Sequence, residues 1–419
     1  MENYAIILVV LGLMAFLYAV SERLKLSSPL LLVITGMAIG CIPSITPLQI
    51  HPEIVFLLFL PPLLFDAAFN LSFSDFKENL NTITGLAFGL VFLTTVGIAA
   101  VAHFIIPGMT WPVSFVLGAT LAATDAVAAI NITKNLGLTK TATTILEGES
   151  LINDASALVA YKFAVAAVAG ATFVFWKASL SFLLLIGGGI AIGYIVYLLQ
   201  TVILRTVRTH HLAVLSFILL SPFIAYLVAE EVQVSGVLAV VTLGFCIARL
   251  STKHFPEKIK QESKTLWEMI AFLLNGLIFI LIGSEFPAII KSIDKTFWLP
   301  YIGYAFLITL VALIIRAMRV SIQRKKLLQA STDPRFQKGR NKISPNAILT
   351  FQDGLIISWA GMRGIVSLAM ALSLPILMDN GHTFPMRNEI IFITTASVLL
   401  TIIGQGLLLP FIVKMGTRS

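Results

Sequence analysis

Residues 119–127 read Ala-Thr-Leu-Ala-Ala-Thr-Asp-Ala-Val and residues 147–154 read Glu-Gly-Glu-Ser-Leu-Ile-Asn-Asp, and these two runs decide how the chain folds. Each lies in a long apolar segment, and a short basic turn separates the two segments. A carboxylate near the centre of a bilayer costs at least about 2.5–3.5 kcal/mol on insertion scales. Asp125, Glu149 and Asp154 must therefore face protein or a water-filled cavity, and an ion pathway is the first hypothesis.

The composition of the whole chain indicates a membrane protein. Of 419 residues, 58% are hydrophobic and 12% are charged, about half the charged fraction of a soluble domain. Many apolar runs reach the ~20 residues that cross a ~30 Å hydrocarbon core as a helix. The sequence shows no alternating strand patterns, so we predict an all-α polytopic fold in the lipid bilayer rather than a barrel.

Thirteen apolar spans can be traced along the sequence. They lie near 3–20, 28–42, 54–70, 82–106, 112–133, 142–171, 178–204, 212–229, 234–249, 265–284, 299–323, 347–375 and 388–413. Lys and Arg gather in alternate connections, including a basic loop at 324–346, whereas the other connections hold only Lys177, Lys291, Lys295 and Arg387. Because cytoplasmic connections are rich in these residues, we predict the N-terminus outside and the C-terminus in the cytoplasm. The same bias explains the net charge of +8 and argues against nucleic-acid binding.

Thr124-Asp125 on one span, followed by Glu149-Ser-x-x-Asn-Asp154 on the next, resembles the monovalent cation:proton antiporter-1 family. This family comprises the NhaP-type and animal sodium/proton exchangers. Three further stretches share the resemblance, namely 59–66, 267–283 and Gly361-Met-Arg-Gly364.

The resemblance implies an inverted-repeat antiporter fold with broken crossing helices, assembled as a homodimer. Helices near 82–171 and 299–413 would form the ion-binding core, and those near 1–70 and 178–284 the dimerisation side. The break near Asp125 is implied by the resemblance alone, because neither Gly nor Pro stands beside this residue.

Asp154 is the strongest candidate for the ligand of a transported ion. It lies about twelve residues into its span, roughly 18 Å along a helix and near the middle of the membrane. By resemblance, Thr124, Asp125 and Ser150 complete a Na⁺ site around it. The resemblance also implies that Asp66 approaches this site from the cytoplasmic side, although its position equally allows a solvated helix end.

Glu149 is interpreted as a structural acid. It shares a helix face with Asn153 and points about 140° away from Asp154. A buried acid requires a buried cation, and the spans offer Arg316 and Arg363. We favour Arg316, which the resemblance also implies, and keep Arg363 as the rival. Glycines on both sides of Arg363 suggest a helix break, where a cation would offset the helix-end dipoles. Other acids at inner span ends, such as Asp353, are interpreted as boundary charges.

Several motifs of other function classes are missing from the sequence. Gly148-Glu-Ser-Leu-Ile lacks the second glycine of a nucleophile elbow, and no phosphate-binding loop is present for ATP. A potassium-filter sequence is also absent. We therefore predict neither an enzyme nor a cofactor.

Together these features predict secondary antiport of Na⁺ or Li⁺ against protons in the cell membrane, by competition of cation and proton for Asp154. The preceding residue is the neutral Asn153, where charge-moving relatives carry a second acid. By resemblance this implies electroneutral one-for-one exchange. K⁺/H⁺ exchange by the same fold is the main alternative, and a cation channel is a weaker one.

Overall fold

The chain folds almost entirely into helices in a computed structural model, which describes residues 2–24, 28–42, 55–133, 139–170, 175–207, 210–291, 293–332, 349–378 and 381–416. Most of the basic loop predicted at 324–346 lies outside the described residues. The helices form two compact units. The first unit comprises Met1–Ile50, Ser74–Ala171 and Gly276–Ser419, and the second comprises His51–Phe73 and Thr172–Asn275.

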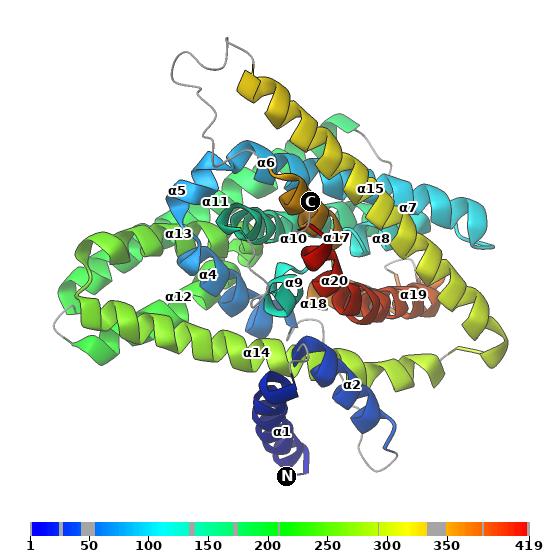
Figure 1. The fold of residues 1–419 in the computed structure, drawn as a ribbon, viewed down its shortest axis with the longest axis horizontal. Coiled ribbons are helices and arrows are strands. Elements are labelled where there is room, and N and C mark those ends of the chain that lie inside the picture. The colour runs from blue at the N-terminus through cyan, green and yellow to red at the C-terminus, as the bar shows by residue number, and fades with distance from the viewer. Residues whose placement is uncertain are drawn as a thin grey trace. The chain divides into compact units, whose positions relative to one another are not determined.

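The first unit contains both sequence runs that carry the candidate acids. Figure 1 labels its α-helices. In chain order its elements are α1 (Glu2–Leu24), α2 (Ser28–Gly40), α5 (Phe73–Glu78), α6 (Leu80–Thr84), the π-helix η2 (Gly85–Leu90), α7 (Val91–Ile105), α8 (Trp111–Thr120), α9 (Ala126–Thr133), α10 (Lys140–Val168), the last part of α14 (Glu257–Lys291), the 3₁₀-helix η3 (Lys295–Phe297), α15 (Trp298–Thr332), α17 (Phe351–Trp359), α18 (Ile365–Leu372), α19 (Arg387–Leu399), the π-helix η5 (Leu400–Gln405) and α20 (Gly406–Gly416).

The second unit is built from η1 (Val55–Phe59), α4 (Leu60–Asn70), α11 (Phe175–Val207), α12 (His211–Glu231), α13 (Gly236–His254) and the first part of α14 (Glu257–Lys291). Gly244 of α13 lies so close to α4 that a side chain there would meet Ala68. The rings of Phe65 and Trp267 are 4.7 Å apart between centroids. The division into an ion-binding core and a dimerisation side stays a prediction. The compact units group residues 1–50 with the candidate site rather than with α11–α13.

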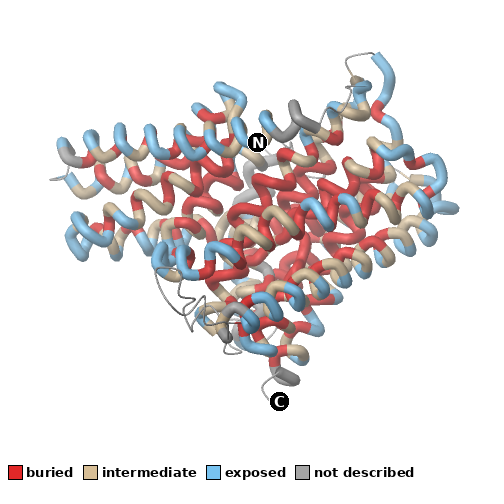
Figure 2. Tube along the Cα trace, turned by 90° about the horizontal axis from the view of Figure 1, so that it is seen from above, coloured by how far each residue is buried: buried red, intermediate tan, exposed pale blue. Residues whose placement is uncertain are grey.

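The helix lengths agree with a protein of many membrane spans. Among the described residues, eight helices are long and apolar enough to cross a bilayer, and four shorter apolar helices accompany them. Individual helices carry buried positions on one side and exposed positions on the other (Figure 2). The all-α prediction is confirmed, whereas the count of thirteen spans stays a prediction.

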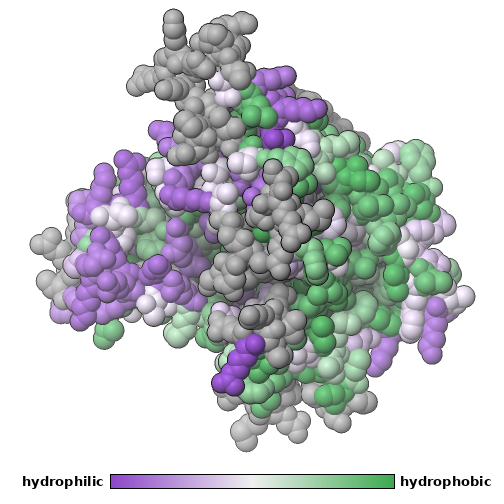
Figure 3. Space-filling view, viewed as in Figure 1, coloured by the Kyte–Doolittle hydropathy of each residue, from purple (hydrophilic) through white to green (hydrophobic). Residues whose placement is uncertain are grey.

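The surface of α15 shows which solvent the first unit meets. Only 17% of the residues in its most apolar 18-residue stretch are buried. Its exposed large apolar side chains include Leu299, Phe306, Leu310, Ile314 and Met318. In Figure 3, hydrophobic residues also gather over the side where α15 and α7 lie in Figure 1. A helix whose outer face is this apolar is suited to contact lipid rather than water.

Two predicted spans of the first unit are interrupted in the middle. Residues 121–125 separate α8 from α9, and residues 360–364 separate α17 from α18. Glycines favour the second break, and Gly361 lies so close to Arg316 that an added side chain would collide with it. The first break contains no glycine or proline, so contacts from elsewhere in the fold have to hold it open.

Candidate functional site

The two helix breaks cross and bond to each other. The backbone N–H of Asp125, in the first break, donates to the carbonyl of Met362, in the second break, at 2.7 Å. Each break exposes backbone groups that a continuous helix would satisfy internally. The crossing therefore concentrates unsatisfied helix ends at one place, and charged side chains compensate for them.

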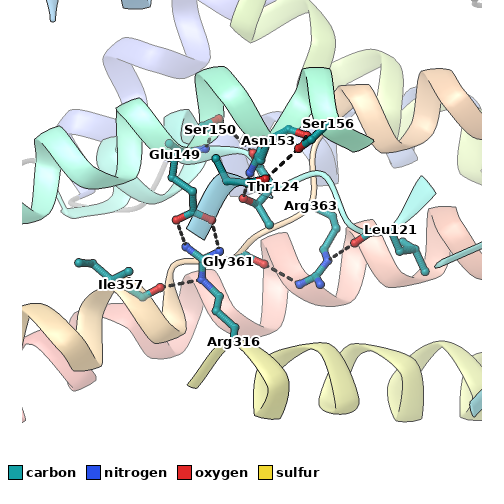
Figure 4. A network of polar contacts seen from close by, with 12 residues as sticks. Leu121, Thr124, Glu149, Ser150, Asn153, Ser156, Arg316, Ile357, Gly361 and Arg363 are labelled. Carbon is teal, nitrogen blue, oxygen red and sulfur yellow. Dashed lines mark hydrogen bonds and ion pairs between the residues drawn. The ribbon is translucent and has the colours of Figure 1, made fainter. Parts of the chain in front are cut away.

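Arg363 satisfies the carbonyl ends of two half-helices. Its Nε donates to the Leu121 carbonyl at 3.1 Å, and another guanidinium nitrogen donates to the Gly361 carbonyl at 2.7 Å (Figure 4). These carbonyls follow the ends of α8 and α17, where the helix dipoles are negative. The backbone N–H of Arg363 donates to Thr401 Oγ1 at 3.1 Å, which ties the second break to η5. The side chain is 4% exposed, so its charge acts inside the protein.

Asp125 compensates for the opposite ends of the other two half-helices. Its Oδ1 accepts a hydrogen bond from the backbone N–H of Val127 at 2.8 Å, in the first turn of α9. Its carboxylate also lies against Gly364, just before α18, where any side chain would collide with it. Helix N-termini favour a negative charge. Asp125 and Arg363 thus neutralise the four helix ends that meet at the crossing.

A polar network ties α10 to the first break. Asn153 Nδ2 donates to Thr124 Oγ1 at 2.5 Å, and Ser150 Oγ donates to the Thr124 carbonyl at 3.0 Å (Figure 4). Ser150 Oγ also accepts a hydrogen bond from the Ala126 N–H at 3.4 Å. The predicted ligands Thr124, Ser150 and Asp125 therefore belong to one small region.

Asp154 lies in the middle of α10, one residue beyond this network. Its side chain is 8% exposed. Within the described ranges, no hydrogen bond or ion pair reaches its carboxylate, and the negative charge of Asp125 acts on it electrostatically. The fold thus holds an acid in an apolar span, and no described residue supplies a counter-ion for it.

Glu149 stands on another face of α10 and is fully paired. Arg316 of α15 donates two hydrogen bonds to its carboxylate, at 2.5 and 2.7 Å, with both side chains buried. The Nε of Arg316 also donates to the Ile357 carbonyl of α17 at 2.7 Å (Figure 4). Of the two rival partners, Arg316 is the one that lies against Glu149, and Arg363 serves the helix ends instead.

Asp66 belongs to the second unit. It lies in α4, where Asn70 Nδ2 donates to its Oδ1 at 2.7 Å. The negative charge of Glu268 also acts on it electrostatically. Glu268 is exposed and pairs with Lys264 at 3.8 Å. The approach of Asp66 to the ion site stays a prediction.

Some residues that shape the site are not evident from the sequence. Thr401 and Ser156 act through backbone contacts, and Ser156 Oγ donates to the Ala87 carbonyl of η2 at 2.8 Å. Thr139 and Asp353 join the starts of α10 and α17. Hydroxyl residues are common in apolar helices, so no local pattern distinguishes these from the others.

Comparisons with known proteins agree with this arrangement. The family model "Sodium/hydrogen exchanger, transmembrane" matches residues 8–415. A sodium, potassium, lithium and rubidium/H(+) antiporter of Bacillus pumilus is 33% identical over 98% of this chain, which spans 61% of that relative's length. The Na(+)/H(+) antiporter ApNhaP of Aphanothece halophytica is 32% identical over 99% of this chain and 74% of its own length.

A solved structure has the same fold. The sodium proton antiporter MjNhaP1 from Methanocaldococcus jannaschii superimposes with a TM-score of 0.73 over 99% of this chain and 98% of its own. The two sequences are 19% identical, so the likeness concerns the fold. It confirms the predicted antiporter fold with broken crossing helices.

Proposed function

The chain belongs to the sodium/hydrogen exchanger family, and on this premise we propose that it exchanges a monovalent cation for protons across the cell membrane. The family resemblance predicted from the sequence is thereby confirmed, and the family is one of transporters rather than enzymes. Na⁺ and Li⁺ are the first candidate cations. The finer parts of the proposal concern which residue binds the cation, how many protons are exchanged for each cation, and which cation is transported.

The unpaired carboxylate of Asp154 is the observation that carries the proposal. It lies in the middle of a membrane helix, 8% exposed and without a bonding partner among the described residues. Either a proton or a cation neutralises this carboxylate, and the two cannot do so together. Binding of one therefore releases the other, which couples the two ions as the protein opens to each side in turn.

Oxygen atoms beside Asp154 complete the proposed cation site. Hard cations take oxygen ligands. The adjoining break offers the hydroxyl of Thr124 and the carboxylate of Asp125, and α10 offers the hydroxyl of Ser150, which bonds to that break. Asn153 Oδ1 is a further candidate, because this buried oxygen accepts no hydrogen bond from any described residue. Its amide nitrogen bonds to Thr124, and this contact holds the side chain in place.

Electroneutral exchange follows if Asp154 is the only group that changes its proton during the cycle. One proton then leaves as one cation arrives, and Asn153 offers no second site. A difference of one pH unit, about 1.4 kcal/mol per proton, would balance a tenfold cation gradient. The membrane potential would contribute nothing, instead of about 2.3 kcal/mol per net charge per 100 mV.

The name of one relative supports an alternative for the transported cation. The Bacillus pumilus relative is named for potassium and rubidium as well as for sodium and lithium. K⁺/H⁺ exchange by the same site is therefore the second candidate. We retain as proposals the homodimer, the outside N-terminus and the cytoplasmic C-terminus.

The test is exchange by the purified protein in proteoliposomes. A pH-sensitive dye inside the vesicles reports proton movement when Na⁺, Li⁺ or K⁺ is added outside. Once K⁺ is shown to move no protons, valinomycin with K⁺ sets the membrane potential for the measurements with Na⁺ and Li⁺. We expect Na⁺ or Li⁺ to move protons at the same equilibrium position whatever the potential.

Two results would contradict parts of this proposal. An equilibrium position that shifts with the imposed potential would exclude one-for-one exchange and place a second titrating group in the cycle. Cation flux without any proton counter-movement would instead support a channel.

A further inference from the structure

A buried acid outside the ion site joins the beginnings of two helices that form it. Asp353 stands in the first turn of α17 and is 2% exposed. Its Oδ1 accepts a hydrogen bond from the hydroxyl of Thr139, the N-cap residue of α10. Its Oδ2 accepts hydrogen bonds from the backbone N–H and the hydroxyl of Thr350, at 3.1 and 2.6 Å.

Each threonine also caps its own helix. Thr139 Oγ1 accepts a hydrogen bond from the Ala142 N–H at 3.1 Å, and Thr350 Oγ1 accepts one from the Asp353 N–H at 3.0 Å. A capping box at α17 requires only Thr350 and Asp353. The bond from Thr139 is therefore additional, and it connects the two helix ends.

The chemistry of this cluster requires a carboxylate. Among the described residues, the groups that bond to the oxygens of Asp353 are donors, namely two hydroxyls and one N–H. A carboxylate is an acceptor at both oxygens, whereas an amide would present donors on one side. The predicted boundary charge is thus a buried acceptor shared between α10 and α17.

A second contact between the same helices lies deeper in the fold. Arg316 bonds to Glu149 of α10 and to the Ile357 carbonyl of α17. Asp353 and Ile357 are four residues apart and lie on one face of α17. The two contact points on α10 are ten residues apart, about 15 Å along the axis. Two such contacts fix the orientation of α17 relative to α10, whereas a single contact would allow α17 to pivot about it.

We propose that Asp353 is a positioning residue for the cation site. By joining the starts of α10 and α17, it sets where the break at 360–364 lies relative to Asp154. The break begins seven residues beyond Asp353, about 10 Å along the helix. The predicted change in cation affinity rests on the proposed function, whereas the predicted change in helix dynamics does not.

The test separates capping from the connection between helices. Thr139→Asp keeps a good N-cap for α10 but sets one carboxylate against another. Adding Asp353→Asn to this variant removes the repulsion and supplies an amide donor in its place. Thr139→Ser keeps every contact. Thr143→Val is the matched control, because within the described part of the chain the Thr143 hydroxyl bonds only to the Thr139 carbonyl at the start of its own helix.

Two readouts are compared across these variants. We expect Thr139→Asp to raise the KM for Na⁺ about tenfold, the lower end of losses seen when the support of metal ligands is removed. The double variant should recover to within about twofold of Thr139→Ser. Amide hydrogen exchange in residues 351–359 should rise in Thr139→Asp and fall again in the double variant, with residues 387–399 unchanged.

The results that overturn the proposal are distinct. If Thr139→Asp matches Thr139→Ser in KM and in hydrogen exchange, Asp353 does not position the site. If it lowers only the melting temperature and leaves KM unchanged, Asp353 is a cap and no more. If the wild type exchanges no cation, the proposed function fails instead, and hydrogen exchange alone decides whether the helices are coupled.

Discussion

Glu149 and Asp154 are buried carboxylates of the same helix, and their surroundings are opposite. Glu149 receives two hydrogen bonds from Arg316, which also bonds to α17. Asp154 receives none from any residue in the described part of the chain and is 8% exposed. The side chains of the two acids point about 140° apart around the axis of α10.

The difference shows how one helix can carry both structure and chemistry. An acid buried with its counter-ion is satisfied, so it holds α10, α15 and α17 together. An acid buried without one remains a charge that only a proton or a cation from solution can neutralise. The Glu149 side therefore contributes to stability, and the Asp154 side is the one for which we propose ion exchange.

The largest effect is expected for Asp154→Asn, which should reduce exchange to background. Its thermal stability should stay near that of the wild type, because the change removes a buried charge and breaks no ion pair. Dequenching of a pH dye in proteoliposomes measures the exchange. Asp294→Asn, in the exposed turn before η3, is the control and should exchange normally. A well-folded Asp154→Asn protein that still exchanges would remove Asp154 from the mechanism.

The next largest effect concerns the stability of the Glu149 side. Glu149→Gln and Arg316→Gln should each destabilise the protein by about 3–5 kcal/mol, because the surviving partner is left as an unpaired buried charge. The double variant should lose less than the sum of the two. Thermal unfolding of the four proteins in detergent measures this coupling.

The exposed pair Lys264–Glu268 provides the matched control for this cycle. Its atoms are 3.8 Å apart and its side chains are 63% and 60% exposed, so neutralising either residue should change stability little. Additive losses at Glu149 and Arg316 would show that their contact does not hold the two charges as a unit.

The sequence is sufficient to predict the acids and insufficient to predict what holds them. Depth within a span singled out Asp154, and the need for a counter-ion pointed to Arg316, which does lie against Glu149. The break at 121–125 contains no helix-breaking residue, and only the family resemblance implied it. Its supports are Arg363, from the second break, and Ser150, from α10, so no local pattern encodes the break at 121–125.

Asp353 illustrates the same limit at a helix end. Its place near the start of a span indicated a boundary charge. The structure buries it, because Thr139, 214 residues away in the chain, supplies a donor for its carboxylate. A contact at such separation depends on how the helices pack, and hydrophobic periodicity contains no information about it.

A smaller effect is expected at the helix crossing. Arg363→Gln should weaken exchange about tenfold and cost about 1–3 kcal/mol of stability, because carbonyls at the ends of α8 and α17 lose their charged donor. Arg387→Gln is the control, since Arg387 bonds to carbonyls at the far end of α18, at Leu374 and Leu372. It should lose stability without a change in KM for Na⁺. Equal changes in KM for the two variants would contradict a special role for the crossing.

Proton release on cation binding tests the central claim most directly. Purified protein in weakly buffered detergent solution is titrated with NaCl at a pH where Asp154 is protonated, and the released protons are counted against bound Na⁺. Because ligands must lose their protons to bind a cation, we expect about one proton per Na⁺ for the wild type and none for Asp154→Asn. Undiminished proton release by Asp154→Asn, or Na⁺ binding by the wild type without release, would contradict it.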